Sequence, residues 1–204
     1  TRGPLAICIT VIGEVPAGQA LLRSGAQAGD DIYVSGTLGD ARLALEALRG
    51  LTPVPAQLLG AARDRLEQPT PRVALGQALR GIATAVIDVS DGLLGDLGHV
   101  LQQSGVGARI DTDPALGLLA ARQSDGQALP PEEQQLAWVL AGGDDYELAF
   151  TAPPSRRDAV ASAAQASGTP VTRIGCIESD PGCRLVDAQG RAVAMPARSF
   201  DHFA

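Results

Sequence analysis

Short apolar segments alternate with amphipathic helical patterns along this chain of 204 residues, and that alternation constrains its fold more than any other feature. Strands that alternate with helices predict an α/β or α+β domain. The predicted strands are 31–35, 83–87, 108–111, 146–151, 171–177 and a hairpin of 183–186 with 191–195. The predicted helices are 17–23, 40–48, 57–65, 73–80, 93–101, 130–141 and 159–166.

Composition narrows the class of protein. Hydrophobic residues make up 45% of the chain and aromatic residues only 3%, so we expect one aliphatic core. The net charge of −7 argues against a nucleic-acid partner, and no apolar run approaches the ~20 residues that cross a membrane. The three cysteines, Cys8, Cys176 and Cys183, lack metal-ligand spacing. Cys176 and Cys183 can pair in principle, but reduced cysteines in a cytoplasmic protein are the simpler interpretation.

The chain contains no lysine, because all 16 of its basic residues are arginine. A Walker-type phosphate loop and a Schiff-base mechanism both require lysine, so both are excluded on this chain. Any phosphate site must therefore use arginine, backbone amides or magnesium. Genomic base composition explains the same preference without any functional cause.

The segment 83–101 combines a predicted strand, two acids and a predicted helix. Asp88 and Asp91 follow the apolar run, and Ser90 is a residue type that favours a helix N-cap. A helix N-terminus attracts anions, but two aspartates would repel a phosphate unless a divalent cation lay between them. The pattern is typical of a magnesium-phosphate site, and a solvated polar turn explains it equally well.

The sequence G-G-D-D-Y-E-L at 142–148 places two further acids, Asp144 and Asp145, after a predicted helix. Acids beyond a helix C-terminus oppose its dipole, so water, an arginine or a cationic ligand must compensate for them. A helix end followed by polar turn residues is the alternative to a binding site.

Three other parts of the sequence are weaker candidates for a functional site. Arg23 can bind a phosphate bidentately, although a cation near a helix C-terminus is commoner. The glycine-flanked turn at 36–40 is predicted as a tight turn rather than a phosphate site. Asp96 and His99 share a helix face, where surface polarity is a simpler interpretation than a metal pair.

Several motifs occur in the order found in thiamine-monophosphate kinases, and the chain resembles that family over essentially its whole length. The motifs are T-R-G-P at 1–4, L-R-S-G-A at 22–26, G-T-L-G-D at 36–40, I-D-V-S-D-G-L at 87–93, G-G-D-D-Y-E-L at 142–148 and F-D-H-F at 200–203. The resemblance implies a mixed sheet with helices packed on it, the C-terminal domain of the aminoimidazole-ribonucleotide-synthetase-like fold. It also implies that residues 1–13 hold the last strand of a missing N-terminal domain, at 5–11, and that 14–204 form the domain that binds ATP and substrate.

The activity that the resemblance implies is the ATP-dependent phosphorylation of thiamine monophosphate to thiamine diphosphate, by direct magnesium-assisted transfer. By resemblance, Asp88 and Asp91 bind Mg²⁺, while Arg23 and Ser90 contact ATP. This role for the acids agrees with the magnesium-phosphate interpretation of the segment 83–101.

The acceptor, thiamine monophosphate, is contacted by Asp144 and Phe200 if the resemblance holds. The family more often has glutamate at the position of Asp144. The whole enzyme is expected to be a cytoplasmic homodimer built through its N-terminal domain, so this chain alone is expected to be inactive. Two alternatives remain: another enzyme of the same fold, of the ribonucleotide-synthetase or selenide-kinase type, or a non-catalytic fragment that binds ligand.

Overall fold

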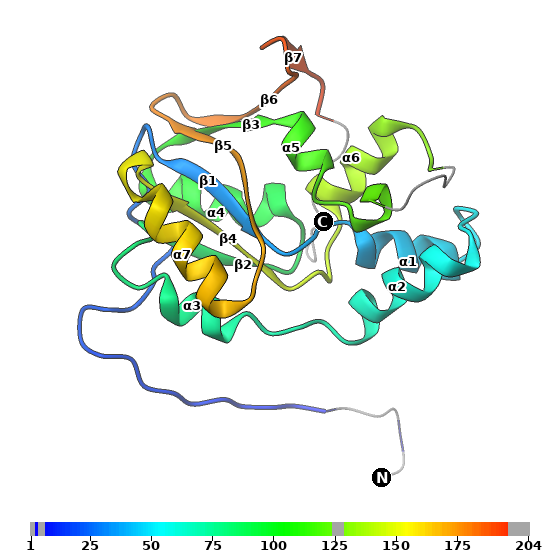
Figure 1. Cartoon of the computed structure of the whole chain (residues 1–204), viewed down its shortest axis with the longest axis horizontal. Coiled ribbons are helices and arrows are strands. Elements are labelled where there is room, and N and C mark those ends of the chain that lie inside the picture. The colour runs from blue at the N-terminus through cyan, green and yellow to red at the C-terminus, as the bar shows by residue number, and fades with distance from the viewer. Residues whose placement is uncertain (1–2, 4–6, 124–128, 196–204) are drawn as a thin grey trace.

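The computed structural model describes residues 3, 7–123 and 129–195 of the chain. Among these residues, seven strands form one sheet in the order β2-β4-β1-β5-β3-β6-β7 (Figure 1). Neighbouring strands are antiparallel except β3 and β6, which run parallel, so the sheet is mixed. The strands are β1 (Asp31–Ser35), β2 (Ala85–Val89), β3 (Gly107–Asp111), β4 (Glu147–Ala152), β5 (Val171–Glu178), β6 (Gly182–Val186) and β7 (Ala192–Val193).

Helices lie on both faces of this sheet (Figure 1). Helices α4, α5 and α6 share the larger hydrophobic cluster with one face, and α3 and α7 form the smaller cluster with the other. Helices α1 and α2 pack on each other beside the sheet. The helices are α1 (Asp40–Leu48), α2 (Ala56–Glu67), α3 (Val73–Ala78), α4 (Leu93–Ser104), α5 (Thr112–Leu116), α6 (Glu132–Ala141) and α7 (Arg157–Ser167), with short 3-10 turns η1 (Ala120–Gln123) and η2 (Pro154–Arg156). The predicted mixed sheet with packed helices is confirmed.

The alternation of side chains along β1 explains why the domain has two hydrophobic clusters. Ile32 and Val34 belong to the larger cluster, whereas Tyr33 between them belongs to the smaller one, because successive residues of a strand face opposite sides. Tyr33 stacks on Phe150 of β4 with 5.2 Å between the ring centroids. Both sides of β1 are therefore buried, and its apolar residues Ile32, Tyr33 and Val34 contribute to both clusters.

Residues 7–30 differ from the expectation, because they contain neither a helix nor a strand. The helix predicted at 17–23 is wrong. Gly18 has a φ of 74°, and the carbonyl of Leu22 accepts a hydrogen bond from Val86 N at 2.8 Å. This segment therefore follows the edge of β2 in place of folding into a helix of its own.

The apolar residues of the segment 7–12 are exposed to solvent. Ile7, Ile9 and Val11 are 75%, 80% and 86% exposed, and Figure 1 shows the segment running away from the sheet. A strand needs a neighbour for its backbone hydrogen bonds, and residues 7–11 have no such neighbour in the described part of the chain. Their assignment to a separate N-terminal domain stays a prediction.

The three cysteines are free thiols. Cys176 on β5 lies opposite Arg109 of β3, and Cys183 on β6 lies opposite Ala108 of β3. Because Ala108 and Arg109 are successive residues, the two thiols lie on opposite faces of the sheet and cannot meet. Among the helices that the structure describes, none has the length and apolar character to cross a membrane.

Candidate functional site

A cavity of about 330 Å³ lies where β2 ends, α4 begins and the turn before β4 passes both. It brings together Ser90, Asp91 and Asp144, three residues that the sequence singled out. Two arginines also line it: Arg42 of α1 and Arg49, the C-cap residue of that helix. The remaining lining residues are Leu45, Ala141, Gly143 and Tyr146.

Backbone hydrogen bonds hold the two acidic turns side by side. Asp144 N donates to Ser90 O at 2.9 Å, and Tyr146 N donates to Val89 O at 2.9 Å. A Cβ at Gly143 would lie 2.6 Å from Ser90 O, so this close approach requires glycine. The sequence predicts that a helix ends at Gly143. In the structure this glycine is a point of contact between the two motifs.

Two cavity residues have an unusual backbone conformation. Asp144 and Tyr146 have φ values of 70° and 52°, and no other non-glycine residue in the described ranges has a positive φ. The left-handed region is costly for residues with a side chain, and such strain is concentrated at functional sites. The conformation therefore supports the assignment of this turn to a site.

Asp145, between these two residues, is fully buried and does not line the cavity. Its carboxylate accepts hydrogen bonds from Gly39 N at 2.7 Å and Ala41 N at 3.2 Å, and so caps the N-terminus of α1. Burial raises the pKa of Asp145 to about 7, against the opposing effect of these two hydrogen bonds. Of the two acids in this turn, Asp145 therefore has backbone amides at the start of α1 as its partners, and only Asp144 lines the cavity.

Glu147, the first residue of β4, is a fully buried acid that the sequence did not single out. Its carboxylate accepts hydrogen bonds from Arg65 Nη2 at 2.7 Å, from Arg72 Nε and Nη2 at 2.6 Å, and from Ser35 Oγ at 2.5 Å. The bond to Glu147 raises the pKa of Arg72. The two arginines precede Glu147 by 82 and 75 residues, so no local pattern predicts this cluster.

Asp88 and Asp91 add to the negative charge around Asp144. Asp88 is exposed near the end of β2, where it lies opposite Leu148. The pKa of the Tyr146 hydroxyl is raised first by burial and then by the charges of Asp144, Asp91 and Asp88. Carboxylate oxygens are ligands that Mg²⁺ prefers. No group of three or more His, Cys, Asp or Glu side chains within the described ranges is arranged to hold a metal ion.

Ser90 does not cap α4, contrary to expectation. The N-cap is Gly92, which has a φ of 113° and makes no side-chain cap bond. Instead, the buried carboxylate of Asp96 accepts hydrogen bonds from Ser90 N at 2.9 Å and Asp91 N at 3.1 Å, and burial raises its pKa. His99 is exposed. Asp96 therefore orders the loop at the cavity, and neither surface polarity nor a metal pair with His99 describes it.

Arg23 does not line the cavity. It is exposed beside Leu22, whose carbonyl binds β2 at Val86. Asp88 lies two residues further along the same strand, a distance of about 7 Å. Arg23 therefore lies in the segment along β2, the strand that also carries Asp88, but the chain runs from Leu22 away from Asp88, since Gly25 lies against Thr84 O.

Two remaining expectations concern Phe200 and the turn 36–40. Phe200 lies outside the described residues. The turn is a tight one, as predicted, with φ values of 56° at Gly36 and 87° at Gly39. Asp40 is buried and accepts hydrogen bonds from two backbone amides of η1 at 3.3 and 3.4 Å, which leaves it a structural role.

Comparison with known sequences gives a consistent match. The family model "AIR synthase related protein, C-terminal domain" matches residues 27–188. The thiamine-monophosphate kinase of Salmonella typhimurium is 44% identical over 208 residues, which cover 100% of this chain and 62% of that protein. The chain thus spans 62% of the length of this relative.

Comparison with solved structures agrees. The thiamine-monophosphate kinase from Stenotrophomonas maltophilia K279a matches with a TM-score of 0.74 and 44% identity, over 88% of this chain and 56% of that one. The structure of AaThiL complexed with AMPPCP and TMP matches with a TM-score of 0.64 and 29% identity, over 90% of this chain and 54% of that one.

Proposed function

The chain belongs to the family of AIR synthase related proteins, whose C-terminal domain it contains, and on this basis we propose that the full-length protein is a thiamine-monophosphate kinase. The reaction transfers the γ-phosphoryl group of ATP to thiamine monophosphate and gives thiamine diphosphate and ADP. The identity of 44% to the Salmonella kinase over this whole chain supports the proposal. So does the likeness to AaThiL, which was complexed with AMPPCP and TMP.

The convergence of Ser90, Asp91 and Asp144 in one cavity is the observation on which the proposal rests. These residues come from two separate motifs, and the family resemblance assigns them to ATP, magnesium and thiamine monophosphate respectively. Direct transfer between two bound substrates requires donor and acceptor to be held together. The first cavity meets this requirement, because the residues assigned to ATP, to magnesium and to thiamine monophosphate all line it.

The cavity offers charges of both signs to the acceptor. The carboxylate of Asp144 complements the positive thiazolium ring, and Arg42 and Arg49 in the same lining complement its phosphate group. Arg42 Nε donates to Glu46 at 2.9 Å, which fixes the direction of this side chain. Thiamine monophosphate, which has one positive ring and one negative end, therefore fits the lining.

The chemistry needs no strong base, because the phosphate oxygen of the acceptor already carries negative charge. The main difficulty is that two anions must approach each other. Positively charged groups that hold both substrates in place reduce this repulsion. Magnesium, when held by Asp88 and Asp91, supplies charge that neutralises the phosphate oxygens. Arg23, in the segment that follows the edge of β2, is the residue that we assign to ATP, and Phe200 is assigned to the acceptor.

We also infer the arrangement of the whole protein. Residues 1–13 would complete an N-terminal domain through which two copies form a homodimer, and residues 14–204 would form the C-terminal domain. The exposed apolar side chains of the segment 7–12 support this division, since they need cover from elsewhere. The free thiols support a cytoplasmic location.

Steady-state assays of the full-length protein with ATP, thiamine monophosphate and magnesium test the function. We expect Asp88→Asn to lower kcat about a hundredfold, because it removes charge that acts on the transferred group. Asp158→Asn, at an exposed position of α7 far from the cavity, is the matched control. Undiminished turnover in Asp88→Asn would reject the role of this acid. A wild-type protein that does not phosphorylate thiamine monophosphate would reject the function and favour another enzyme of the same fold.

A further inference from the structure

Within the described part of the chain, no helix covers β3 and β6 on one face of the sheet. The smaller hydrophobic cluster covers this face where β1, β2 and β4 meet α3 and α7, and it contains no residue of β3 or β6. A cavity of about 570 Å³ lies on this uncovered part, between β3, β5, β6 and the start of α5. It shares no lining residue with the cavity at Ser90 and Asp91.

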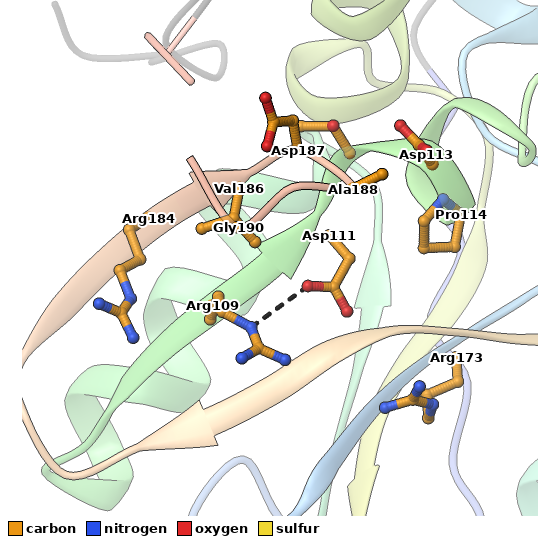
Figure 2. A pocket seen from close by; sticks show the side chains of 11 residues that line it. Arg109, Asp111, Asp113, Pro114, Arg173, Arg184, Val186, Asp187, Ala188 and Gly190 are labelled. Atoms are coloured by element: carbon orange, nitrogen blue, oxygen red, sulfur yellow. Dashed lines mark ion pairs between the residues drawn. The ribbon is translucent and has the colours of Figure 1, made fainter. Parts of the chain in front are cut away.

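Three arginines from three strands line this second cavity: Arg109 of β3, Arg173 of β5 and Arg184 of β6 (Figure 2). Arg109 and Arg184 lie directly opposite one another on neighbouring strands, so their side chains share one face. Like charges at opposite positions are unfavourable in a sheet. A negative group placed between them would remove this repulsion.

The carboxylate next to Arg109 does not satisfy its guanidinium group. Arg109 Nε lies 3.2 Å from Asp111 Oδ1, the ion pair drawn in Figure 2. Nevertheless this nitrogen is buried without a hydrogen bond to any described residue. A buried donor that makes no hydrogen bond costs free energy, which a ligand that accepts from it can recover.

The other two arginines each use one nitrogen within the described part of the chain. Arg173 donates through Nη1 to Asp31 at 3.2 Å, and Arg184 donates through Nη2 to Glu178. A guanidinium group has five N–H donors in a planar fork. Most donors of both side chains are therefore available to a ligand in the cavity.

We propose that this cavity is an anion site that binds the phosphate or diphosphate group of a small molecule. Guanidinium groups match phosphate oxygens bidentately, and the volume is within the range of small-molecule sites. Asp113 and Asp187 line the same cavity, so a ligand that also has a positive group fits it best. The inference does not depend on the proposed function, because it uses other residues and another part of the sheet.

Calorimetric titration of the full-length protein with inorganic pyrophosphate tests the site. The buffer contains EDTA and no magnesium, so that magnesium-dependent binding of phosphates at the first cavity does not contribute. We expect saturable binding to the wild type and about tenfold weaker binding to Arg109→Gln and to Arg184→Gln, because each loses charge-assisted hydrogen bonds.

Arg63→Gln is the matched control, since Arg63 is an exposed arginine of α2 with an ion pair of its own to Glu67. It should keep the wild-type affinity. Arg184 is 62% exposed, so its replacement leaves the fold intact, and an unchanged melting temperature without ligand verifies this. The proposal is wrong if the wild type shows no saturable heat, or if both variants bind pyrophosphate as tightly as Arg63→Gln.

Discussion

Asp144, Asp145 and Glu147 are three acids within four positions, and each meets a different environment. Asp144 lines the cavity at the start of α4. Asp145 is fully buried against the N-terminus of α1, and Glu147 is buried between Arg65 and Arg72. Backbone amides that solvate Asp145 are weaker compensation than two guanidinium groups. For Asp145, burial outweighs the hydrogen bonds from the two amides and raises its pKa to about 7.

Asp145 gives the stability of the domain a pH dependence of known sign. Its pKa rises from 3.8 to about 7 on folding, so the folded state binds this proton more tightly than the unfolded state does. The stability that it contributes is complete below about pH 4 and is lost as the pH rises to about 7, at up to ~1.4 kcal/mol per pH unit. Asp145→Asn removes this titration.

The measurement is urea denaturation of wild type and Asp145→Asn between about pH 5 and pH 8. We expect the free energy of unfolding of the wild type, minus that of the variant, to fall across this range and to level off at its upper end. Asp158→Asn, at an exposed position, should show no such trend. A difference that stays constant with pH would contradict the raised pKa of Asp145.

The turn between α6 and β4 forms hydrogen bonds with several elements at the candidate site. Its backbone amides bind the end of β2, and the carboxylate of Asp145 binds the start of α1. A Cβ at Gly92, the N-cap of α4, would lie 2.9 Å from the carbonyl oxygen of Ala141 at the end of α6. The first cavity therefore lies where four elements are packed so closely that Gly92 and Gly143 have no room for a side chain.

Gly143→Ala is expected to damage the site through this packing. The new Cβ would lie 2.6 Å from Ser90 O, so the two acidic turns must separate. A displacement of this kind lowers kcat/KM for thiamine monophosphate about a hundredfold. Gly98→Ala, in α4, is the control, because a Cβ there meets nothing within 4 Å. It should leave the kinetics unchanged and raise stability by ~0.5–1 kcal/mol; equal kinetics for both variants would refute the argument.

The sequence predicts elements well where local periodicity decides them. The strand 31–35 and the helix 40–48 have the predicted bounds, and the hairpin of β6 and β7 forms around the expected turn. The helix predicted at 17–23 does not form, and the carbonyl of Leu22 instead bonds to Val86 of β2, 64 residues away in sequence. Partners this distant also decide the environment of Glu147, and no periodic pattern encodes them.

The candidate site was predictable in its residue types but only partly in their roles. The sequence identified Ser90, Asp91 and Asp144, which the fold brings into one cavity. It could not separate Asp144 from Asp145, since both are acids in the same turn and only burial distinguishes them. Likewise, Asp96 looked like a surface residue because its two partners are backbone amides, which have no signature in the sequence.

At the scale of the whole molecule, the two cavities lie on different halves of one sheet. The first uses the edge at β2 and β4, and the second uses β3, β5 and β6. The sheet between them is buried on both faces along β1. Ligands at the two places would therefore influence each other through the packing of the core.

The apolar segment 7–12 supplies a test of that wider assembly. In the chain alone, Ile9 is 80% exposed, so Ile9→Ser should leave its melting temperature unchanged within ~1 °C. In the full-length protein the same residue would lie in the last strand of the N-terminal domain. There the substitution should remove a buried side chain and lower the melting temperature by about 5 °C.

Differential scanning calorimetry of both proteins makes the comparison. Val73→Ser, at an exposed apolar residue where α3 begins, is the control and should have little effect in either protein. An equal effect of Ile9→Ser in the two proteins would mean that this segment has the same surroundings in both. The division between residues 1–13 and 14–204 would then be wrong, and the exposed isoleucines would need a different explanation from a neighbouring domain.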